Sequence, residues 1–155
     1  MVATYSEILG WMEAEQLFAA AMSDWRWRQA TLELHARLAD KQAVYAYEFA
    51  WKSPTNEGRL GAGHCVDIPY CFHNMTSPST PYLIGDKAPV ALADTMRSAW
   101  CHFIKSGVLA NDATGEWPGY DLSRRATMMF DETSKLADDP HAARRLYWEN
   151  RKVGG

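Results

Sequence analysis

Residues 43–51 read AVYAYEFAW, and this stretch decides the fold class. Side chains alternate between the two faces of a strand. One face carries Tyr45, Tyr47, Phe49 and Trp51, and the other carries Val44, Ala46, Glu48 and Ala50. Both faces are mostly apolar, which is typical of a strand covered on both sides within a parallel sheet. The stretch therefore predicts an interior strand of an α/β protein.

Two helices are expected before this strand. Residues 4–22 place apolar side chains at helical spacing, and Thr4 with Glu7 has the spacing of a capping box. Ser23 and Asp24 are good N-cap residues, so a second helix is expected to begin there. The expected apolar face of that second helix consists of Trp27, Thr31, Leu34 and Leu38.

The second half of the chain predicts further elements. Residues 89–106 form the strongest helical pattern, with Pro89 suited to the first turn and Gly107 placed to cap the C-terminus. Residues 125–131 are a strand candidate, and Asp139 is the expected N-cap of a last helix. The overall expectation is a helix-rich α/β fold, with four helices around a small sheet.

Composition narrows the class of protein. The chain has 155 residues, a formal charge of −3 and three cysteines, and residues 1–155 are expected to form a single domain. The chain has no basic stripe of the kind that indicates a nucleic-acid partner, so none is expected. No apolar run approaches the roughly 18 residues of a membrane span, so no membrane partner is expected either. Three cysteines without paired spacing favour a reducing compartment, so a cytoplasmic location is expected.

His64 is the first candidate for catalysis. It follows Gly61-Ala62-Gly63 about a dozen residues after the predicted strand. Ligand and catalytic groups of open α/β sheets collect on loops beyond the carboxyl ends of strands, and an imidazole can take and return a proton near neutral pH. We expect His64 on an exposed loop. The alternative is a structural histidine bonded to a backbone carbonyl.

A metal site is the second possibility. Within ten positions the chain carries five side chains of ligand type, namely His64, Cys65, Asp67, Cys71 and His73. Their spacing lacks the close Cys–Cys or His–His pairs of zinc sites. Cys65 and Cys71 are therefore interpreted as small buried apolar groups, and neither a metal nor another cofactor is expected.

A serine nucleophile is not apparent in the 155 residues. No serine lies in the G-x-S-x-G pattern of a nucleophile elbow, and neither a P-loop nor a G-x-G-x-x-G motif occurs. The aromatic content of 12% could indicate a binding platform, but at helix and strand spacing aromatic residues more often form core.

Taken in order, five segments resemble the C-terminal part of the type B carboxylesterases, the esterase/lipase and cholinesterase family of α/β-hydrolases. Residues 44–49 resemble a late sheet strand, and residues 60–72, LGAGHCVDIPYCF, resemble the catalytic-histidine loop with its G-A-x-H-x-x-[ED]-[IL]-P-[FY]-x-F pattern. Residues 92–107 resemble the helix that ends in W-x-x-F-x-x-x-G. Residues 117–121, WPGYD, and 125–131, RATMMFD, resemble the turn and closing strand that follow.

The resemblance implies a role for particular residues. His64 occupies the family's catalytic-base position, and Asp67 matches the acidic residue of the local pattern, which is not the triad acid. The family's serine elbow and triad acid belong to earlier segments that this sequence does not match. The resemblance thus implies a helix-rich α/β-hydrolase fragment in which His64 is separated from its nucleophile, and leaves open whether the chain is an enzyme.

Three functions are compatible with this pattern. The first is a truncated carboxylesterase-like module that is inactive alone. The second is one part of a split ester hydrolase that is active with a serine-bearing chain. The third is a binding module for a small apolar ligand or a protein. A homodimer or a complementing chain is the expected partner, with a contact that includes residues 43–51 or 89–106.

Overall fold

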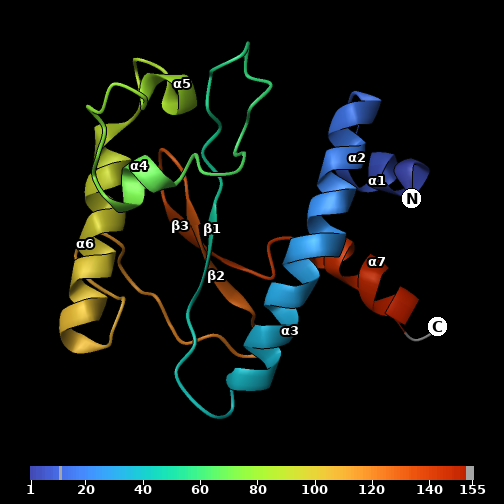
Figure 1. Ribbon diagram of the computed structural model, residues 1–155. Coiled ribbons are helices and arrows are strands. Elements are labelled where there is room, and N and C mark those ends of the chain that lie inside the picture. Colours follow the sequence, from blue (N-terminus) through green and yellow to red (C-terminus); the bar gives the residue numbers. More distant parts are fainter. Residues whose placement is uncertain (11, 153–155) are drawn as a thin grey trace. The chain divides into compact units, whose positions relative to one another are not determined.

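The computed structural model describes residues 1–10 and 12–152, and these fall into two compact units (Figure 1). The first unit consists of residues 1–44, 121–124 and 139–152, and the second of residues 45–120 and 125–138. Within the described residues, no helix is both long and apolar enough to cross a bilayer. The single-domain expectation is not tested by this division and stays a prediction.

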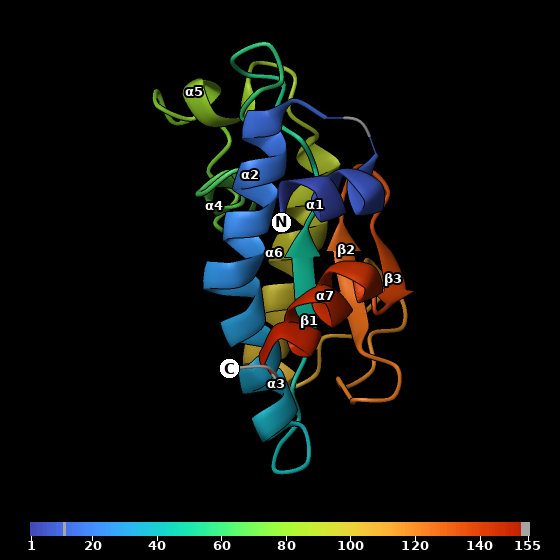
Figure 2. The ribbon, with the colours of Figure 1, turned by 90° about the vertical axis from the view of Figure 1, so that its right-hand side faces the viewer.

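The first unit is helical. Its elements are α1 (Val2–Leu9), α2 (Ala14–Ser23), the π-helical turn η1 (Asp24–Arg28), α3 (Gln29–Leu38) and α7 (Ala142–Lys152). Figure 2 shows α2 running into α3 as one continuous helix, with η1 between them. The core of this unit contains the buried side chains of Tyr5, Leu17, Ala21 and Tyr147.

The predicted helix over residues 4–22 is wrong in its extent. It is divided because Gly10 has a φ of 80°, which ends α1. Thr4 lies inside α1, which has no side-chain cap, so the predicted capping box is also wrong. Trp11, one of the apolar residues at helical spacing in this predicted helix, lies outside the described residues.

The predicted start of the second helix is wrong as well. Ser23 and Asp24 both have right-handed helical backbone angles, and the helix passes through them without a break. The expected apolar face is exposed, because the side chains of Trp27 and Leu34 are 68% and 55% accessible. Sequence periodicity identified an apolar stripe there, but the described residues do not bury it.

The second unit contains a three-stranded sheet in the order β1 (Ala46–Phe49), β2 (Ala126–Phe130) and β3 (Lys135–Asp138). β1 pairs parallel to β2, with Ala46 opposite Thr127, and β2 pairs antiparallel to β3. The two predicted strands and the parallel pairing are confirmed. β3 was not predicted, and β1 lies at an edge of this sheet rather than in its interior.

Helices α4 (Ile68–Cys71), α5 (Pro81–Ile84) and α6 (Val90–Ser106) belong to the same unit. α4 packs against α6, and Figure 1 shows both on one side of the sheet. The predicted C-terminal cap of α6 is confirmed, because Gly107 is left-handed with a φ of 76°. Pro89 is the N-cap residue and not part of the first turn.

The aromatic face of β1 is packed against this helical layer. The Tyr47 and Trp100 ring centroids are 5.1 Å apart, and those of Phe49 and Tyr70 are also 5.1 Å apart. Trp51 is buried in the core and Tyr45 and Phe49 pack against it, so the interpretation of aromatic residues as core is confirmed for these three side chains, whereas Tyr47 is 43% exposed. Ile104, near the end of the helix predicted over residues 89–106, is 82% exposed.

Candidate functional site

The loop that leads to His64 is closed at its base. After β1, Ser53 forms an isolated antiparallel bridge with Gly61, and the Ser53 amide donates to the Gly61 carbonyl at 3.0 Å. Ser53 is buried, and its Oγ lies 2.9 Å from Oγ1 of Thr55. The bridge fixes where the chain re-enters the unit, three residues before His64.

A tight turn then presents His64. Gly63 is required in this turn because a Cβ at its position would lie 2.8 Å from the backbone oxygen of Leu60. The next residue after His64, Cys65, has a φ of 68°, which few side chains adopt. His64 is exposed, and within the described residues it makes no hydrogen bond or ion pair. The expected surface position of His64 is confirmed.

The neighbouring ligand-type side chains are not gathered around His64. Cys65 and Cys71 are free thiols and half-buried, and Cys71 packs against the core of the second unit. Burial raises the pKa of the Cys71 thiol, which disfavours the thiolate needed for attack or metal binding. In the described part of the chain, no three His, Cys, Asp or Glu side chains could hold a metal ion together.

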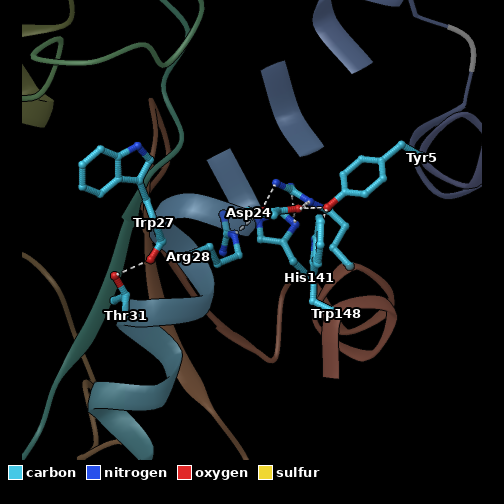
Figure 3. Close-up of polar contacts among 8 residues, drawn as sticks. Tyr5, Asp24, Trp27, Arg28, Thr31, His141 and Trp148 are labelled. Atoms are coloured by element: carbon cyan, nitrogen blue, oxygen red, sulfur yellow. Dashed lines mark hydrogen bonds and ion pairs between the residues drawn. The ribbon is translucent and has the colours of Figure 1, made fainter. Parts of the chain in front are cut away.

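The first unit contains a buried polar cluster that sequence reasoning missed. Figure 3 shows Asp24 at its centre, with no exposed surface. The Asp24 carboxylate accepts hydrogen bonds from the Tyr5 hydroxyl at 2.6 Å, from Nε of Arg28 at 2.9 Å and from Nε of Arg144 at 2.6 Å. The Trp148 indole donates to the Tyr5 oxygen at 2.7 Å. The cluster thus joins α1, η1 and α7.

The chemistry of this cluster is structural. Burial and the hydrogen bond to Asp24 raise the pKa of Tyr5 to about 12, so its hydroxyl stays protonated and donates. Every oxygen of the Asp24 carboxylate is bonded, which is what a buried charge requires. The i, i+4 spacing of Asp24 and Arg28 was readable in the sequence, whereas the distant Arg144 was not.

Comparisons with known proteins agree with the fold. Residues 12–148 match the model of the carboxylesterase family. A phenmedipham hydrolase of Pseudarthrobacter oxydans is 32% identical over 111 residues, which cover 66% of this chain and 22% of that protein. A para-nitrobenzyl esterase of Bacillus subtilis is 29% identical over 124 residues, covering 77% of this chain and 24% of that one.

A solved structure gives the same result. The carboxylesterase of Geobacillus stearothermophilus superposes with a TM-score of 0.78 at 26% identity, covering 95% of this chain and 31% of that one. The fold is that of an α/β-hydrolase, and the chain belongs to the carboxylesterase family. It spans about a quarter of the length of the curated relatives it matches.

Proposed function

We propose that these 155 residues supply the catalytic base, His64, of a carboxylic ester hydrolase and do not hydrolyse esters alone. A single observation carries the proposal: His64 stands exposed on a turn of defined geometry, within a segment that matches the carboxylesterase family. A histidine in that setting can take a proton from a nucleophile and return it to a leaving group.

The residues around His64 support this role and also explain the expected inactivity. Gly63 permits the turn, and no hydrogen bond within the described residues holds the imidazole of His64 away from a substrate. The sequence contains no G-x-S-x-G elbow. A serine and oxyanion donors are needed for ester hydrolysis, so a second segment would have to bring them.

Reconstitution tests this proposal. The chain would be co-expressed with the Bacillus subtilis para-nitrobenzyl esterase from which the matching segment has been deleted, and p-nitrophenyl acetate hydrolysis would be measured. We expect activity with the natural sequence, and at least a 10³-fold lower rate with His64→Ala, because removing one triad member eliminates most of the catalysis.

A matched control separates chemistry from folding. His102, a half-buried histidine of α6 in the same unit, is replaced by alanine, and this variant should restore activity. Equal activity of the pairs containing His64→Ala and the natural sequence would contradict the role of His64. Absence of activity in every pair would contradict the proposal that His64 supplies the catalytic base and would leave an inactive module.

Self-association is a further part of the proposal, favoured by the edge of the sheet. β1 has a single neighbour, β2, among the described residues, and Tyr47 is 43% exposed beside the open edge. An apolar edge strand can pair with another chain. We propose that a second copy covers this edge, and that the two copies meet through β1 across a two-fold axis.

A further inference from the structure

The segment that carries His64 is a continuous hydrogen-bonded spiral. The Val66 amide donates to the Gly63 carbonyl at 3.3 Å, and the Ile68 amide to the Cys65 carbonyl at 3.2 Å. Through α4 the pattern continues to the Asn74 amide, which donates to Pro69 at 2.8 Å. Because each bond overlaps the next, residues 63–74 are expected to move as one body.

The middle of this spiral is anchored in the core. Pro69 and Tyr70 are buried, and Val66 has no exposed surface. These residues, together with the packing of α4 against α6, hold the middle of the spiral, while its two ends make separate contacts. The His64 end leads back to the Ser53–Gly61 bridge described above.

The other end of the spiral is held by His73. Its Nε2 lies 2.8 Å from Oδ1 of Asp94, which is in the second turn of α6. The ionised carboxylate can only accept, so the imidazole N–H donates. α6 is itself fixed, because Leu92, Ala93 and Met96 are buried in the core. The contact therefore ties the spiral to a helix that does not move easily.

The backbone of His73 is held in a disfavoured conformation beside this contact. His73 has a φ of 52°, a left-handed conformation that is disfavoured for residues other than glycine. The next residue, Asn74, accepts a hydrogen bond at its carbonyl from Oγ1 of Thr80, which is 4% exposed. A disfavoured conformation persists where the surrounding bonds determine it.

We propose that His73 is a positioning residue: its hydrogen bond to Asp94 sets the orientation of the spiral and thereby the position of the His64 imidazole. The inference rests on the proposed function of His64. The side chains of His73 and Asp94 are 30% and 65% exposed. An exposed pair of this kind contributes little to global stability, so its effect should be local.

The test uses hydrogen exchange in the 155-residue chain, followed by NMR at individual amides. His73→Gly removes the side chain but accommodates the left-handed backbone, so it isolates the lost hydrogen bond. We expect the Val66 and Ile68 amides to exchange about two- to fivefold faster, and the His64 ring resonances to shift. Asp94→Ala should have the same effect. Asp94→Asn keeps an acceptor oxygen, so its exchange rates and ring resonances should stay close to those of the natural chain.

The control is Asp112→Ala, which removes an exposed aspartate of the same unit and should change neither readout. Unchanged exchange at Val66 and Ile68 in His73→Gly would overturn the inference, as would changes confined to residues 73 and 74.

In the reconstituted pair, His73→Gly should lower kcat two- to fivefold with KM unchanged. An active natural pair with unaltered kcat in His73→Gly would overturn the positioning role while leaving the proposed function standing. Faster exchange in His73→Gly with no activity in any reconstituted pair would contradict the proposed function of His64 and leave the positioning role of His73 standing.

Discussion

Arg144 binds the carboxylate of Asp24, 120 residues earlier in the chain, through two hydrogen bonds of 2.6 Å. Its Nε donates to Oδ2 and its Nη2 to Oδ1. This bidentate geometry is the strong form of the arginine–carboxylate pair. Because Asp24 lies at the π-helical turn and Arg144 in α7, the pair links the beginning and the end of the first unit.

Asp24→Asn should destabilise the chain by about 3–5 kcal/mol, because it leaves the Arg144 side chain, which is only 12% exposed, without a compensating charge. The free energy of unfolding in urea measures the effect. Arg37 and Glu33 provide the control, since they form an exposed i, i+4 pair in the same unit. Glu33→Gln should cost about 0.5 kcal/mol or less. A loss below 1 kcal/mol for Asp24→Asn would show that the cluster is not a stabilising centre.

The same cluster predicts a loss of stability in alkaline solution. The pKa of Tyr5 is raised to about 12 in the folded chain, whereas a tyrosine in the unfolded chain has a pKa near 10. Between these values unfolding releases the Tyr5 proton, so stability is intact below about pH 10 and falls by about 1.4 kcal/mol per pH unit above it.

Urea unfolding from pH 8 to 12 checks this dependence. The stability of Tyr5→Phe should fall less steeply with pH than that of the natural chain, because unfolding of the variant releases about one proton fewer. A decline should remain, because burial also raises the pKa of Tyr70. Identical slopes in the natural chain and the variant would exclude Tyr5 as a source of the pH dependence.

Gly63→Ala should disturb the turn that presents His64. The added Cβ would meet the Leu60 oxygen at 2.8 Å, and a backbone atom can yield only if the loop shifts. Overpacking of this kind costs about 1–3 kcal/mol. Thermal unfolding and the His64 ring resonances would report it. If Gly63→Ala unfolds at the same temperature as the natural chain and leaves the His64 ring resonances unshifted, the loop accommodates the Cβ and the prediction is wrong.

The proposed pairing of β1 edges predicts a difference between two substitutions of one residue. Tyr47 lies in β1, which has a single neighbour, β2, among the described residues, and the Tyr47 amide is one of the backbone donors of this edge strand. Tyr47→Ala keeps this amide and Tyr47→Pro removes it. Light scattering should give a dimer for the natural chain and Tyr47→Ala, and a monomer for Tyr47→Pro. A monomeric natural chain at high concentration would refute the pairing.

Local patterns predicted the second unit better than the first. The apolar run around Tyr47 and the helix ended by Gly107 are determined by neighbouring residues, and both were found. Asp24 was misread because N-cap preference is a local property, whereas its role depends on Arg144. The exposed face with Trp27 shows the same limit, since periodicity identifies a stripe without identifying what covers it.

The candidate site was predictable for a related reason. His64 and its glycines form a short contiguous motif, so the exposed turn could be inferred from residue types alone. The contact between His73 and Asp94 spans 21 positions and depends on how α4 packs against α6. No spacing rule connects those two residues.

Hydrolysis of short p-nitrophenyl esters by the isolated 155-residue chain is the most direct test of the central claim. No serine of these 155 residues lies in a nucleophile-elbow pattern, and we propose that His64 therefore has no activated nucleophile to deprotonate. The natural chain and His64→Ala should both hydrolyse the ester at the uncatalysed rate. Turnover by the natural chain that disappears in His64→Ala would contradict the account.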